Sequence, residues 1–332
     1  MEDLPQEIWD VEILLRHFSR LKSDDDWRDA GRLRQVCKAL RDRVPRMIRE
    51  IRLWPETPAH AMRPYTYATR LCVEHNAHVT DIHLARLTRL TSLGLDHSRI
   101  RGYGFLSLTA LVTLRLGSHQ SSAAVCIALL TGLTSLSLGE NNHIRDVHLA
   151  PLTRLTELEL CGNTRITDTG LLALTALTDL SLGKNRNITD TALGALTGLT
   201  SLDLCENTRV TDAGVRGLTA LRYLQLLENT RVTDAGLRNL KALTFLCLGM
   251  SKKVTDAGVQ GLTALDHLDL MFNENITDAA IRRLTALTSL ELGHVRNAKI
   301  TEATLGRLCK VTAAYEEIEA EEDMALLNTL LY

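Results

Sequence analysis

Two small groups of side chains in this sequence are of types that carry chemistry. His75, His78 and His83 lie close together, and the His-x-x-His spacing is compatible with a pair of metal ligands. No cysteine or carboxylate stands at a matching spacing beside them, so we expect these histidines in a solvent-facing turn and predict no metal site. Cys161 and Cys205 occupy equivalent places about 10 Å apart, too far for a disulfide.

The carboxylates Glu157, Glu159 and Asp179 resemble an acid–base pair of the kind that catalysis uses. We expect them on an open, solvated surface, where the pKa of a carboxyl group has little reason to shift, so catalysis is not expected there. The sequence also lacks a phosphate loop, a Rossmann fingerprint and a nucleophile elbow. It therefore predicts no catalytic residue and no cofactor.

The elements that position these residues repeat along the chain. A typical unit, residues 174–196, reads LTALTDLSLGKNRNITDTALGAL. Its central leucine recurs every 22 residues, and earlier leucines extend the series with nearly the same step. The series comprises Leu71, Leu93, Leu114, Leu136, Leu158, Leu180, Leu202, Leu224, Leu246, Leu268 and Leu290.

This pattern of leucine and asparagine resembles leucine-rich repeats, in which each unit stacks one strand and one short helix or 3₁₀ turn. The resemblance implies an α/β solenoid, a horseshoe with a parallel sheet on its concave face. Leu180 and Leu182 point inward from the strand, and Asn185 supplies hydrogen bonds to the turn that follows. Thr189 is expected to cap the short helix, with Asp190 in its first turn.

Four segments are predicted along the chain: an N-terminal helical module (1–50), a capping or linker segment (51–70), the repeats (71–308) and a C-terminal acidic capping helix (309–332). Ile51 and Leu53 have the spacing of an imperfect first strand. The last segment combines an acidic run with leucines, which fits either a cap over the final repeat or a docking helix.

The N-terminal module resembles an F-box. The matching residues are L-P-x-E-I at Leu4, Pro5, Glu7 and Ile8, followed by L-x-x-V-C-K-x-L-x-x-x-V at Leu33, Val36, Cys37, Lys38, Leu40 and Val44. The resemblance implies that Leu4, Pro5, Glu7, Ile8, Val36, Cys37 and Leu40 contact a Skp-type adaptor, which links the chain to a cullin–RING ubiquitin ligase. The alternative is a plain helical cap on the first repeat. The L-T-x-L and I-T-D-x-G-L phrasing is also similar to GALA-type F-box repeat proteins.

Side chains that alternate with the leucines are expected to line the concave face and to bind a protein substrate. An acidic middle is followed by an apolar and aromatic region, of the kind that binding hot spots favour. The predicted substrate-binding residues are Glu157, Glu159, Asp179, Asp203, Tyr223, Leu227, Phe245, Met250, His267, Met271 and Phe272. The alternative for the residues near turns is packing against neighbouring repeats.

Composition supports this interpretation. The net charge is −2 and the hydrophobic content is 45%, so no basic excess attracts nucleic acid or membrane. The seven cysteines have no paired spacing and the first residues have no apolar signal-peptide core, which favours a cytoplasmic or nuclear location. The sequence thus predicts a non-catalytic subunit that recruits substrates to a ubiquitin ligase. The alternative is a repeat scaffold whose N-terminal helices only cap it.

Overall fold

The computed structural model describes residues 49–55, 57–96, 100–117, 124–293, 299–306, 308 and 310–312. The F-box-like motif lies outside these residues, so its assignment stays a prediction. Of the segment predicted as a C-terminal helix, residues 310–312 instead form a strand, which continues the sheet, and residues 313–332 lie outside the described residues. The chain forms two compact units, the first ending at Gly198 and the second beginning at Leu199.

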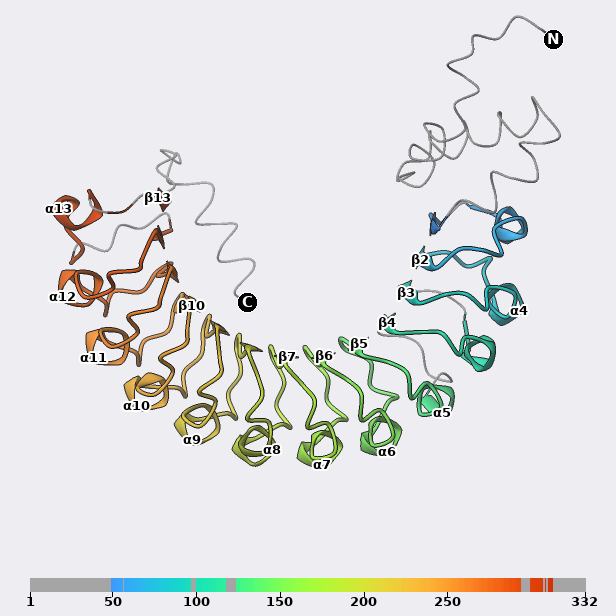
Figure 1. Cartoon of the computed structure of the whole chain (residues 1–332), viewed down its shortest axis with the longest axis horizontal. Helices are drawn as coiled ribbons and strands as arrows, with labels where there is room; N and C mark the ends of the chain where they lie inside the picture. The colour runs from blue at the N-terminus through green and yellow to red at the C-terminus, as the bar shows by residue number, and fades with distance from the viewer. Residues whose placement is uncertain are drawn as a thin grey trace, which may run out of the picture. The chain divides into compact units, whose positions relative to one another are not determined.

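The first unit alternates strands with short helices (Figure 1). Its strands are β1 (Glu50–Leu53), β2 (Arg70–Glu74), β3 (Ser92–Asp96), β4 (Thr113–Leu116), β5 (Ser135–Ser137), β6 (Glu157–Glu159) and β7 (Asp179–Ser181). Its helices are η2 (Ala59–Met62), α4 (Asp81–Leu84), η3 (Tyr103–Ser107), α5 (Ala124–Ile127), α6 (Asp146–Leu149), α7 (Asp168–Leu171) and α8 (Asp190–Ala195), of which η2 and η3 are 3₁₀ turns.

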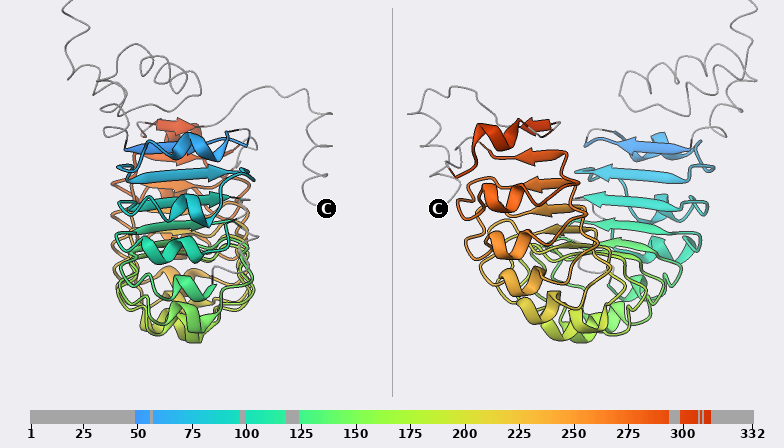
Figure 2. Two further views of the ribbon diagram at one scale, coloured as in Figure 1. Left: turned by 90° about the vertical axis from the view of Figure 1, so that its right-hand side faces the viewer. Right: turned by 60° about the vertical axis from the view of Figure 1, so that its left-hand side comes forward.

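The second unit continues the same alternation. Its strands are β8 (Ser201–Asp203), β9 (Tyr223–Gln225), β10 (Phe245–Cys247), β11 (His267–Asp269), β12 (Ser289–Glu291) and β13 (Lys310–Thr312). Its helices are α9 (Asp212–Val215), α10 (Asp234–Leu237), α11 (Asp256–Val259), α12 (Asp278–Ile281) and α13 (Glu302–Leu305). Within each unit the strands lie side by side on one side and the helices on the other (Figure 2).

The strands of each unit pair in parallel and in chain order, so the register follows the repeat. Leu136 is opposite Leu158, and Leu246 is opposite Leu268, its equivalent one repeat later. The predicted strand at Ile51 and Leu53 is present as β1, which pairs with β2. Because equivalent residues align, each column of the sheet holds one position of the repeat.

The leucine wedge forms the core, as the sequence predicts. Leu180 and Leu182 are fully buried, whereas Asp179, beside them on the strand, is exposed. Neighbouring repeats bury the wedge of each unit, because a single repeat has too little apolar surface to do so alone.

A column of buried asparagines joins each repeat to the one before it. Asn229 Nδ2 donates to the carbonyl oxygens of Leu204 and Asn207 at 3.2 and 3.0 Å. Its Oδ1 accepts from the backbone N–H groups of Arg231 and Val232, each at 2.9 Å. One side chain therefore bonds two carbonyls of the preceding turn and two amides of its own, and of these groups Leu204 O also accepts from the Asn207 N–H at 3.0 Å.

A second link lies on the helical side and differs from the simple expectation for the Thr-Asp pair. Thr233 caps α10 as predicted, because its side chain accepts from the Ala235 N–H. Asp212, in the first turn of α9, accepts hydrogen bonds from the N–H and hydroxyl of Thr233, each at 2.7 Å. The helix dipole is thus only part of the reason for the aspartate, which also holds the cap of the next repeat in place.

We expect Asn229→Ala to lower the free energy of unfolding by about 1–3 kcal/mol, because it removes hydrogen-bond partners from buried backbone groups, among them the Val232 N–H. Chemical denaturation followed by circular dichroism measures this change. Asn275→Ala is the matched control, since Asn275 Nδ2 also donates to a carbonyl of the preceding repeat, Lys252 O, but at an exposed position. A loss in the control as large as that of Asn229→Ala would contradict the assigned role.

The lowered pKa of Asp278 predicts that the stability of the protein depends on pH. Burial opposes ionisation of Asp278, but hydrogen bonds from the Thr301 N–H and hydroxyl and from Thr304, together with Arg282, lower its pKa to about 2. Because this pKa is below the ordinary 3.8, the stabilisation is complete above that value and disappears as the pH falls toward 2. Thr301→Val should raise the pKa of Asp278 and reduce the loss of stability in this window.

Titration of the Asp278 carboxyl carbon by NMR measures that pKa directly. Thr301→Ser keeps a hydroxyl and should leave the pKa near 2. An unchanged pKa in Thr301→Val would show that the hydroxyl does not contribute.

Candidate functional site

The candidate site is the strand face, by which we mean the side chains that alternate with the buried leucines on the strands, together with the turn residues directly after them. All eleven predicted substrate-binding residues lie on this face, four in the acidic region and seven in the apolar region. Glu157, Glu159 and Asp179 belong to the first unit, whereas Asp203 and the whole apolar region belong to the second.

The acidic region of the first unit is an open groove of about 490 Å³ that includes Arg115 and Glu157 in its lining. Glu157 lies opposite Asp179 in the register of β6 and β7, and both are exposed. Like charges on directly opposite positions destabilise a sheet unless a cation lies between them. Glu159 is half-buried and accepts a hydrogen bond from Ser137 Oγ at 2.6 Å. This groove is suited to cationic groups of a partner.

Asp203 begins the second unit's share of the face and has a structural contact. Its Oδ1 accepts from the Cys205 N–H at 2.8 Å, as Asp269 Oδ1 accepts from the Met271 N–H at 2.9 Å. Each aspartate thus fixes the turn after its own strand. A carboxylate has further acceptor capacity, so this contact is compatible with the predicted binding role.

Three predicted residues form a ladder of stacked rings on successive strands, which we call the ring ladder: Tyr223, Phe245 and His267. The Tyr223 and Phe245 ring centroids are 4.4 Å apart with planes at 12°, and those of Phe245 and His267 are 4.5 Å apart at 4°. Tyr223 donates its hydroxyl proton to Gln225 Oε1 at 2.7 Å, and His267 Nε2 lies 3.5 Å from Glu291 Oε1. The rings are half-buried by one another, and their remaining surface is exposed to solvent.

The four turn residues divide into two pairs. Leu227 lies over Gly249 and Met271 lies over Gly293, so closely that a Cβ atom at either glycine would be 2.6 or 2.8 Å from the covering side chain. These two residues pack on the next repeat, which supports the alternative expected for residues near turns. Met250 and Phe272 instead line an open hollow of about 800 Å³ together with Glu228, Lys252 and Glu274.

The helical side of the first unit carries an apolar surface that the sequence interpretation missed. Ile82, Tyr103 and Val147 occupy the same column and are 74%, 66% and 70% exposed, and Leu106, Leu129 and Leu172 are also exposed. The signal was available, since the later repeats have threonine or alanine in this column (Thr169, Thr191, Ala213, Ala235).

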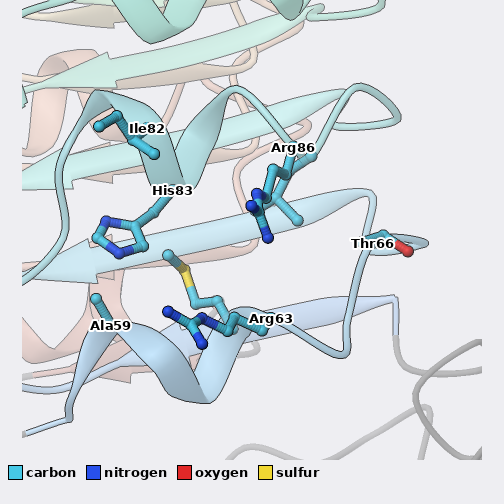
Figure 3. Close-up of a pocket in the computed structure, with 8 residues that line it drawn as sticks. Ala59, Arg63, Thr66, Ile82, His83 and Arg86 are labelled. Atoms are coloured by element: carbon cyan, nitrogen blue, oxygen red, sulfur yellow. The ribbon is translucent and has the colours of Figure 1, made fainter.

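Figure 3 shows a pocket beside Ile82, where Arg63 faces His83 and Arg86 of the next repeat, and its volume is about 70 Å³. This volume holds a few water molecules, which excludes a sizeable ligand.

His83 has a structural contact as well. Its Nδ1 lies 3.2 Å from the Thr80 N–H and accepts from it, which closes a capping box at the start of α4. Among the residues that the structure describes, no group of three or more histidine, cysteine or carboxylate side chains could hold a metal ion. Cys161 and Cys205 are not in a disulfide, and Cys161 Sγ lies 3.0 Å from Ser181 Oγ. Burial raises the pKa of the Cys247 thiol, which donates to Asp269 Oδ2 at 3.1 Å.

No helix within the described ranges is both long enough and apolar enough to span a bilayer.

Comparisons with known proteins agree with this architecture. Residues 152–174 match the family described as Leucine Rich repeat. No curated protein matches the chain in sequence. Among solved structures, the chain is similar to an internalin (inlF) from Listeria monocytogenes, with 27% identity over 77% of each chain and a TM-score of 0.58. It is also similar to the complex of Rad7 and Elc1 from yeast, with 17% identity over 83% of this chain and 85% of that chain and a TM-score of 0.57.

The fold is therefore a leucine-rich-repeat solenoid, as the sequence predicts. Proteins built from such repeats are generally non-catalytic scaffolds for protein–protein interaction. At 17% identity, the likeness to the yeast complex concerns the fold alone.

The ring ladder predicts coupling between its members. In a double-mutant cycle of Tyr223→Ala and Phe245→Ala, we expect an interaction energy of about 0.5–1.5 kcal/mol, the usual value of a stacked aromatic pair. Unfolding free energies from chemical denaturation give the cycle. The pair Tyr223→Ala and Ser289→Ala is the control, because these residues are on strands that are not neighbours and should be additive. A coupling near zero for the first pair would contradict the stacked geometry.

Proposed function

We propose that this chain is a non-catalytic subunit that recruits protein substrates to a cullin–RING ubiquitin ligase. In this proposal residues 1–50 bind a Skp-type adaptor, and through it a cullin, while the strand face binds the substrate. The adaptor contacts are those that the F-box resemblance implies: Leu4, Pro5, Glu7, Ile8, Val36, Cys37 and Leu40. A cytoplasmic or nuclear location fits such a role.

The observation that carries the binding half of the proposal is the ring ladder with its flanking hollow. Aromatic and methionine side chains left partly exposed on a rigid sheet favour burial against a partner, and such residues dominate the binding energy of protein interfaces. A repeat scaffold holds them at fixed spacing, so little conformational entropy is lost on binding.

The ligase half rests on the order of the two motifs in the sequence. The F-box-like residues come first and the repeats follow, which suits an adaptor-binding end joined to a substrate-binding face. Rad7, from the yeast complex of similar fold, is an example of such a protein found together with a second protein, Elc1.

A plain interaction scaffold is the second candidate. Its specific support is the family match, which falls within the repeats at residues 152–174. In that case residues 1–50 only cover β1, and the strand face binds its partner without any link to ubiquitin.

Co-purification with a Skp-type adaptor distinguishes the two. We expect the full chain to retain the adaptor, and a chain without residues 1–50 to lose it. A Leu4/Pro5/Ile8 triple-alanine chain should also lose it, because the apolar contact surface is removed.

A triple-alanine change at Arg28, Asp29 and Arg32, outside the motif, is the matched control and should still bind. A full chain that is folded by circular dichroism but retains no adaptor would overturn the ligase proposal and leave the scaffold.

A further inference from the structure

Met250 and Phe272 have a backbone conformation that is unfavourable for large side chains, and the fold does not require large side chains there. Both have φ of 55°, in the left-handed region that large side chains rarely occupy. Gly162 stands at the same place in an earlier repeat, directly before the turn asparagine, with φ of 67°. A non-glycine residue there costs on the order of 1 kcal/mol. Glycine would therefore build the same turn at lower cost.

Packing of the core does not account for these two side chains. The leucines beside them, Leu248 and Leu270, are fully buried, whereas Met250 and Phe272 are half-buried and line the open hollow. Lys184, Glu206 and Glu228 occupy the same left-handed position, but their charged groups can extend into water. A thioether and a phenyl ring gain nothing from that exposure, so an apolar partner is the remaining reason to hold them there.

The ring ladder extends this apolar surface across the sheet. Phe245 begins β10 and Met250 follows its end, five residues along the chain, so at most about 18 Å separates the two. The ladder and the hollow thus mark opposite edges of one strip. A segment that crosses the strip touches both.

Carboxylates dominate the charge around the strip. Glu228 and Glu274 line the hollow with Lys252, and a second cation, Lys299 Nζ, donates to Glu274 O at 2.9 Å. Glu291 lies beside His267 at the end of the ladder with 45% of its side chain exposed, so the carboxylates still outnumber the lysines. An acidic field of this kind attracts cationic partners and repels the phosphates of nucleic acids and anionic lipids.

We propose that the strand face of the second unit binds a cationic, amphipathic segment of the partner protein. Aromatic or long aliphatic side chains of that segment pack on the ring ladder and between Met250 and Phe272. Its arginine or lysine side chains pair with Glu228, Glu274 and Glu291. This inference rests on the proposed role of the strand face in binding the substrate, and it adds the chemistry that the substrate must present.

The direct test selects peptides from a phage-displayed library of random 16-residue sequences on the intact full chain. Phage that also bind a Tyr223→Ala/Phe245→Ala chain are removed beforehand. We expect the enriched peptides to carry both basic and aromatic or aliphatic residues. Enriched peptides that are acidic, or polar throughout, would overturn the proposal, and so would the absence of any peptide that distinguishes the two chains.

A second test separates binding from stability at the two strained positions. In Met250→Gly/Phe272→Gly we expect a Tm that is unchanged or a few degrees higher, because the strain is relieved. The same change should lower the affinity for the selected peptides at least tenfold, which is about the effect of losing one hot-spot residue. Fluorescence anisotropy measures this affinity.

Lys184→Gly is the matched control, because it relieves the same left-handed conformation in the first unit, with φ of 57°, and leaves the strip intact. It should keep full peptide affinity. A lower Tm in Met250→Gly/Phe272→Gly, with unchanged affinity, would show that the two side chains serve packing alone and would overturn the inference.

Adaptor retention is measured on the same chains. We expect Met250→Gly/Phe272→Gly to retain the adaptor while losing the peptides. If the unchanged chain binds the adaptor but selects no basic and apolar peptides, only the proposed partner chemistry is refuted. If it selects such peptides but binds no adaptor, only the ligase proposal is refuted.

Discussion

Hydrogen bonding between neighbouring repeats is the constraint on which this structure depends. The turns after the strands hold backbone carbonyls and amides without ladder partners in a buried place. Asn229 shows how they are bonded, because it donates to carbonyls of the preceding turn and accepts from amides of its own. On the helical side an aspartate accepts from the threonine one repeat later, as Asp234 accepts from Thr255. Both links connect a repeat only to its neighbour, so stability adds up along the chain.

Because these links use only a few positions of each repeat, the remaining positions can vary without loss of the fold and are available for binding. A strand of three residues contributes one buried leucine and two outward side chains, as Tyr223, Leu224 and Gln225 do in β9. Because the register places equivalent residues side by side, outward side chains form columns, and a change in one repeat alters a column at one point. The ring ladder is such a column with aromatic rings in three successive repeats.

The sequence predicts the repeated part of this structure well, because period and alternation determine it. Leu180, Asn185 and Thr189 have the predicted roles. The aspartate link was not predicted, because its partner lies one repeat away and a local helix argument does not reach it. Tyr223, Phe245 and Phe272 were grouped correctly on one face, but the left-handed backbone at Met250 and Phe272 has no signal in residue type, since glycine or asparagine is the usual occupant. Leu227 differs from Met250 because Leu227 covers a glycine of the next repeat, Gly249, a contact between repeats that sequence spacing does not predict.

Links that join only adjacent repeats also determine how the chain responds to tension. Force applied along the chain loads one asparagine and one aspartate link at a time, rather than the whole sheet together. Each released repeat frees 22 residues, which is about 75 Å of extended chain. A partner held on the strip spanning β9 to β11 would tie several repeats together, so binding there would make those repeats yield as one block instead of in single steps.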